Sequence, residues 1–81
     1  MKSHDELKRL IVISPEILGG TPVFRNTRVP VKNLFDYLKA GDSLFEFLEN
    51  FPSVDKKVAL KVLDLAEYLV EHEELSNETA A

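Results

Sequence analysis

Apolar residues recur at helical spacing through most of the chain after residue 30. Three successive stretches show this spacing, which places their apolar side chains on one face of a helix. The apolar positions are Val31, Leu34, Phe35 and Leu38; Leu44, Phe47, Leu48 and Phe51; and Val58, Ala59, Val62, Leu63, Leu65, Ala66, Leu69 and Val70. The pattern predicts three helices, which together form a bundle over residues 30–72.

Local signals mark the ends of the first two helices. Pro30 suits a first helical turn, where its missing N–H is not needed. Gly41 is expected to end the first helix as a C-terminal cap. Ser43 and Glu46, three residues apart, have the form of a capping box for the second helix, which Pro52 stops.

The third helix is predicted over residues 54–72, with Ser53 as its cap and Asp55 favourably placed in its first turn. Its apolar stripe covers nearly half the circumference, more than one small helical layer needs. Either the preceding arm packs on this excess or a second copy of the chain does. We favour the second copy, with a dimer interface at Val62, Leu65 and Leu69.

Residues 10–29 have a different character. Leu10 to Ile13 is a short β-branched run, residues 15–22 are rich in glycine and proline, and Val23–Phe24 can form a second strand. Arg25 to Arg28 reads as a turn, because Asn26 tolerates the left-handed conformation. The predicted fold is mainly α: a three-helix, winged-helix-like helix-turn-helix domain with a small N-terminal β-arm. Residues 1–9 are an N-terminal arm and residues 73–81 a flexible acidic tail.

Length and charge refine this picture. A chain of 81 residues forms one small domain, and without cysteine it has no disulfide to stabilise it, so we expect a homodimer. The net charge of −4 is unevenly spread. Residues 1–40 carry seven basic and four acidic side chains, whereas residues 41–81 carry three basic and ten acidic ones. This split indicates one surface for an anion and another for a cationic partner, or else simply a solvated acidic end.

A short connection between the second and third helices is typical of the helix-turn-helix, whose second helix enters the DNA major groove. The side chains predicted to bind nucleic acid fall in two clusters: Lys56, Lys57 and Lys61 on the third helix, and Arg25, Arg28 and Lys32 on the turn and the first helix. The third helix begins without the arginine, asparagine or glutamine that reads bases, so phosphate contact is expected. The alternatives are a plain bundle without a ligand and an Arg28 that only ties the turn to the bundle.

Nothing in the sequence favours catalysis. It has no glycine-rich phosphate loop, its serines look like caps, and His4 and His72 lie far apart without ligand-like neighbours. We predict no enzyme activity, no metal and no cofactor. With no apolar run near the length of a membrane span and no signal-peptide core, a cytoplasmic location is expected.

The stretch from Ile13 to Val31, ISPEILGGTPVFRNTRVPV, closely resembles the opening motif of a bacterial and archaeal family, domain of unknown function 433 (DUF433). Tyr37-Leu38, Ala40-Gly41 and Phe51-Pro52-Ser53 resemble it too, so the likeness spans about residues 10–70. At Asn26 the family usually has glycine; asparagine can hold the same turn.

The resemblance implies a helix-turn-helix protein of the VapB-type antitoxin-like kind. Such an antitoxin represses its own operon as a dimer bound to promoter DNA and blocks a PIN-like ribonuclease toxin by direct contact. The alternative function is a protein-interaction module that never binds DNA, which the net negative charge favours.

Overall fold

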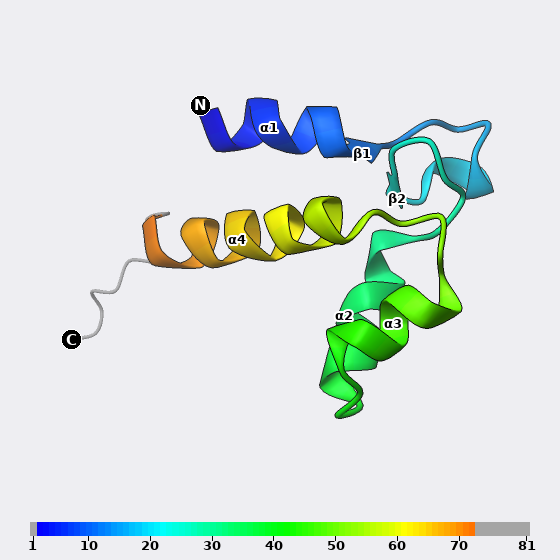
Figure 1. The fold of residues 1–81 in the computed structure, drawn as a ribbon. Helices are drawn as coiled ribbons and strands as arrows, with labels where there is room; N and C mark the ends of the chain where they lie inside the picture. The colour runs from blue at the N-terminus through cyan, green and yellow to red at the C-terminus, as the bar shows by residue number, and fades with distance from the viewer. Residues whose placement is uncertain (1, 73–81) are drawn as a thin grey trace.

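Two pairs of helices meet beside a small sheet in the part of the chain, residues 2–72, that the computed structural model describes. In chain order the elements are α1 (Lys2–Leu10), β1 (Ile11–Val12), the 3-10 turn η1 (Leu18–Gly20), β2 (Val23–Phe24), α2 (Val31–Lys39), α3 (Leu44–Asn50) and α4 (Lys56–His72). In Figure 1, α1 lies antiparallel beside α4, while α2 and α3 pack together below the first half of α4. The predicted class, mainly helical with a small β-arm, is confirmed.

The β-arm is a two-stranded antiparallel sheet in which Ile11 pairs with Phe24 and Val12 with Val23. Val23 also bridges to Pro30, which follows the turn. Both residues of β2 are fully buried, so the sheet contributes directly to the core. The first strand is shorter than the sequence indicated, because Leu10 belongs to the preceding helix.

The predicted turn after β2 is present and is closed by the side chain of Thr27. Its hydroxyl donates to the carbonyl of Phe24 at 2.8 Å and accepts from the backbone N–H of Val29 at 3.0 Å. Asn26 has a φ of 66°, the left-handed conformation expected of it. The turn therefore has a single, locally hydrogen-bonded shape.

Helix α1 is a correction to the sequence analysis, which assigned residues 1–9 to an N-terminal arm. The helix lies along α4, and on α4 Val62 is only 3% exposed and Leu65 only 6%. The wide apolar stripe of α4 is therefore covered, at these two positions, within the chain itself. This removes the reason for placing Val62 and Leu65 in a dimer interface; Leu69 is half-buried.

The predicted ends of α2 and the predicted bounds of α3 agree with the structure, except that Pro30 lies just before the first turn of α2, as its N-cap in extended conformation. Gly41 follows α2 with a φ of 93°, a left-handed conformation that glycine adopts without strain. At the start of α3 the Ser43 hydroxyl accepts from the Glu46 N–H at 3.0 Å, and the Glu46 carboxylate accepts from the Ser43 N–H at 2.8 Å. This is the complete capping box.

The start of α4 differs from the prediction. The helix begins at Lys56, and the cap is Asp55, whose carboxylate accepts from the N–H of Lys57 at 2.7 Å. Ser53 is not the cap. Val54, predicted as helical, donates its N–H to the carbonyl of Phe51 at 3.0 Å and is buried in the core. The apolar anchor at Val54 holds the connection in a turn, so the helix starts two residues later.

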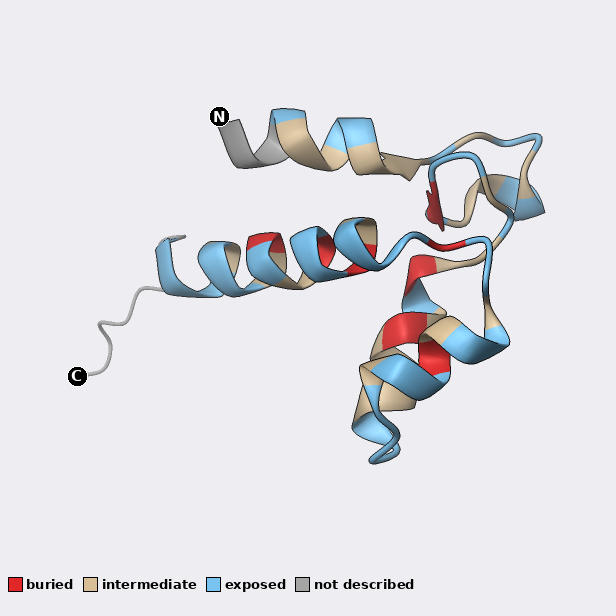
Figure 2. Ribbon diagram, viewed as in Figure 1, coloured by how far each residue is buried: buried red, intermediate tan, exposed pale blue. Residues whose placement is uncertain are grey.

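Phe47 lies at the centre of the core. Its ring centroid is 6.1 Å from that of Phe24, 5.5 Å from that of Tyr37 and 5.1 Å from that of Phe51. These contacts join β2, α2 and α3, and Val54, Ala59 and Val62 bring the start of α4 onto the same cluster. After Phe51 the chain changes direction steeply into α4 (Figure 1). Figure 2 shows how the buried residues gather where the elements meet.

We expect Phe47→Ala to lower the free energy of unfolding by about 3–5 kcal/mol, because it removes the ring that three elements share. Phe45 lies on the same helix but is 67% exposed, and Phe45→Ala should change stability by less than about 0.5 kcal/mol. Urea unfolding followed by circular dichroism measures both. Equal losses for the two variants would contradict this description of the core.

Candidate nucleic-acid interface

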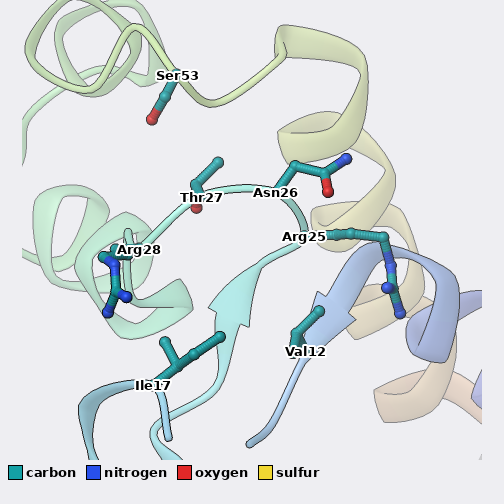
Figure 3. A pocket seen from close by; sticks show the side chains of 7 residues that line it. All are labelled: Val12, Ile17, Arg25, Asn26, Thr27, Arg28 and Ser53. Atoms are coloured by element: carbon teal, nitrogen blue, oxygen red, sulfur yellow. The ribbon is translucent and has the colours of Figure 1, made fainter.

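Three basic segments converge at one end of the molecule: the end of α1, the turn after β2 and the start of α4 (Figure 1). A shallow, open hollow of about 540 Å³ lies at this end. It is lined by Val12, Ile17, Arg25, Asn26, Thr27, Arg28 and Ser53 (Figure 3). Two arginines and three other polar side chains thus line it together with the apolar Val12 and Ile17.

Arg25 points from the turn toward α1 (Figure 3) and caps the end of that helix. Its Nε donates to the carbonyl of Arg9 at 2.7 Å, a terminal nitrogen donates to the carbonyl of Lys8, and its backbone N–H donates to the carbonyl of Leu10 at 2.8 Å. The last carbonyls of a helix lack partners within it and carry partial negative charge, so a guanidinium is favourable there. Arg25, predicted to bind nucleic acid, thus has a structural role.

Arg28 occupies the other side of the same turn and is exposed. Within residues 2–72 its side chain makes neither a hydrogen bond nor an ion pair. The sequence analysis left open that Arg28 ties the turn to the bundle; the arginine that ties the turn, to α1, is Arg25. The guanidinium of Arg28 is therefore available to a ligand.

The four predicted lysines fall into two groups. Lys56 and Lys57 are exposed at the start of α4. Lys61 has its Nζ 3.7 Å from a carboxylate oxygen of Glu6 on α1, and Lys32 has its Nζ 2.6 Å from Asp36 one turn along α2. The hydrogen bond from Lys32 holds the pKa of Asp36 below its usual value.

Among the six residues predicted to bind nucleic acid, Arg28 lines the hollow together with Ser53, which lies shortly before α4. Lys56 and Lys57, at the start of α4, are exposed. Lys32 does not line this hollow. The sequence analysis missed Asn26 and Ser53 as lining residues, since it interpreted them only as a turn former and a cap. In the sequence, Asn26 lies close to Arg28 and Ser53 lies close to the predicted helix start. Only the tertiary structure shows that the two residues line the same hollow.

Across residues 2–72 no three His, Cys, Asp or Glu side chains come together as metal ligands would. None of the helices in this range combines the length and apolar character needed to cross a lipid bilayer.

The fold and this surface define a small helical domain with a cationic end. The family model described as "Protein of unknown function (DUF433)" matches residues 11–66, and the chain belongs to this family. The match begins directly after α1, so this helix lies outside the region that the family model covers.

The chain is also similar to two other proteins. The uncharacterized protein y4eO of Sinorhizobium fredii (strain NBRC 101917 / NGR234) is 48% identical over 48 residues, which are 59% of this chain and 22% of that protein. The chain therefore spans about a fifth of that relative's length. The crystal structure of a DUF433 member from Anabaena variabilis ATCC 29413 matches with a TM-score of 0.61 and 29% identity, covering 90% of this chain and 69% of the other.

We expect the two arginines of the turn to separate in a stability measurement. Arg25→Ala should lower the free energy of unfolding by about 1–2 kcal/mol, since the carbonyls of Lys8 and Arg9 at the end of α1 lose their charged donor. Arg28→Ala should change it by less than about 0.5 kcal/mol. Urea unfolding of both variants is the measurement, with Arg25→Lys expected to be intermediate. A larger loss for Arg28→Ala than for Arg25→Ala would contradict the assignment.

Proposed function

We propose that this protein is the DNA-binding antitoxin of a type II toxin–antitoxin pair. It represses its own operon through the cationic end and neutralises a PIN-like ribonuclease through an acidic surface. The antitoxin role rests on the DUF433 resemblance of the motif from Ile13 to Val31. DNA binding rests on the arrangement of charges.

The observation that supports DNA binding is the presence of exposed cations on three segments at the end of the molecule that holds the hollow. Arg28 on the turn and Lys56 at the start of α4 are exposed, and Lys8 and Arg9 are exposed where α1 ends nearby. Arginine and lysine side chains grouped on one surface are the usual means of contacting the phosphates of a duplex. Phosphate contact supplies affinity without much sequence information.

The structure changes which groups make these contacts. At the N-terminus of α4 the carboxylate of Asp55 already accepts from the N–H of Lys57, which makes this helix end less favourable for a phosphate. Arg28 and Asn26 at the hollow are, by contrast, residue types that hydrogen-bond guanine and adenine edges. The turn then supplies the base contacts, and α4 supplies phosphate contact.

The acidic surface proposed for the toxin lies on α3 and just before it, where Asp42, Glu46 and Glu49 are exposed. A nuclease that binds RNA needs a cationic surface, so opposite charge would favour docking here. Co-purification with the product of an adjacent nuclease-like gene tests this half of the proposal.

For DNA binding we expect a gel shift with the promoter fragment upstream of the gene. With about four phosphate contacts, affinity should fall about a hundredfold between 50 and 200 mM salt. Arg28→Glu/Lys56→Glu should weaken binding at least about tenfold at 50 mM salt, because it reverses two of the proposed contacts. The control Lys39→Glu lies at the end of α2, outside the hollow, and should change affinity less than about threefold.

A wild-type protein that gives no shift at 50 mM salt would rule out the DNA half of the proposal. The second candidate, a protein-interaction module without DNA binding, would then stand. One observation favours that candidate: Arg25, Lys32 and Lys61, half of the predicted nucleic-acid residues, are already engaged within the chain.

A further inference from the structure

One face of α4, turned away from the core, has an unusual order of charges. Lys57 and Lys61 lie four residues apart in its first half, and Glu67 and Glu71 lie four apart in its second half, all of them exposed. Like charges at this spacing repel each other along an isolated helix, whereas alternating charges would attract. The single chain therefore bears two unfavourable pairs on one face.

The order is symmetric about Asp64. Lys57 precedes it by seven residues and Glu71 follows it by seven; Lys61 precedes it by three and Glu67 follows it by three. Two exposed apolar side chains share the symmetry: Leu60 and Tyr68 lie four residues before and after Asp64, and each is 41% exposed. These positions recur every three or four residues, so they form one continuous strip.

We propose that a second copy of this chain docks on this strip, α4 antiparallel against α4, with the two-fold axis at Asp64. In this arrangement Lys57 lies opposite Glu71 of the partner subunit, and Lys61 lies opposite Glu67 of the partner subunit. Leu60 then packs on Tyr68 of the partner subunit. A two-fold contact repeats each pair, so four ion pairs and two apolar contacts form.

Charge fixes the direction of this contact. A parallel arrangement in register would set lysine against lysine and glutamate against glutamate, at several positions. The antiparallel one relieves the repulsion within each helix by adding an opposite charge beside it. One like-charge contact remains, Asp64 against Asp64 of the partner subunit. The proposal therefore predicts that removing this charge strengthens the dimer.

This interface differs from the one that the sequence indicated. Val62 and Leu65 stay inside each subunit, covered by α1, while the opposite face of α4 makes the contact. Lys57 and Lys61 become subunit contacts in place of phosphate contacts. Lys61 lies 3.7 Å from Glu6 of its own chain, so its ammonium is shared between two carboxylates.

The experiment uses the full chain in 50 mM salt, where ion pairs are least screened. Sedimentation equilibrium should show a wild-type dimer with a Kd in the micromolar range. Lys57→Glu/Lys61→Glu and Glu67→Lys/Glu71→Lys should each raise the Kd at least about tenfold, since every ion pair becomes a repulsion. A 1:1 mixture of the two variants should restore a dimer, as a heterodimer, because all facing charges are then opposite.

Three further variants sharpen the result. The fourfold exchange Lys57→Glu/Lys61→Glu/Glu67→Lys/Glu71→Lys should return the Kd to near its wild-type value. Asp64→Asn should lower the Kd, because it removes the repulsion at the two-fold axis. Glu49→Lys, an exposed reversal on α3, is the control and should leave the Kd unchanged. Circular dichroism checks that each variant keeps its helices.

A wild-type protein that is monomeric at 100 µM, or a mixture of the two double variants that stays monomeric, would overturn the proposal. So would an Asp64→Asn variant that dissociates more readily than wild type. The measurement contains no DNA and no toxin, so its result is independent of the gel shift that tests the proposed function.

Discussion

The contact between Phe47 and its aromatic neighbours is the constraint on which the rest of the structure depends. The chain has no disulfide, and few of its large side chains are fully buried. One ring therefore sets the distance between β2, α2 and α3, since Phe24, Tyr37 and Phe51 all pack on it. With β2 fixed, the turn after it is fixed as well. Arg25, on this turn, then donates to the carbonyls of Lys8 and Arg9 at the end of α1. The position of α1 therefore depends on the position of the turn, and through it on Phe47.

The parts of the fold that sequence analysis predicted are those governed by neighbours in the chain. The Ser43–Glu46 capping box, the glycine after α2 and the left-handed Asn26 each depend on groups within a few residues. Helix α1 was missed because its own sequence is largely polar, and only Leu7 and Leu10 among residues 5–10 are apolar. The sequence holds only indirect evidence of this helix, namely that the apolar stripe on α4 is wider than one helical layer needs. The sequence analysis attributed that extra width to a dimer interface.

The same distinction holds for the candidate site. Sequence analysis expected cationic side chains on the turn and at the start of α4, and Arg28, Lys56 and Lys57 are exposed there. It did not separate Arg25 from Arg28, because nothing local distinguishes two arginines three residues apart. The difference arises from the carbonyls at the end of α1, which come within reach of Arg25 only once β1 has paired with β2. The sequence therefore indicated which side chains are cationic, whereas only the tertiary structure shows which of them are free to contact a ligand.

The charge order of α4 and the cationic end of the molecule are linked by geometry. Lys56 lies eight residues before Asp64, and a helix rises about 1.5 Å per residue, so a two-fold axis at Asp64 separates the two Lys56 positions by about 24 Å along the helix direction. The turn that carries Arg28 borders the residues preceding α4, through the hollow it shares with Ser53. This separation is of the same order as the spacing of about 34 Å between successive turns of a DNA groove, though shorter than it along the helix direction. The order of charges on α4 that sets the orientation of two subunits therefore also sets the distance between their cationic ends. Lys57 and Lys61 thereby affect DNA binding through the dimer, without contacting a phosphate themselves.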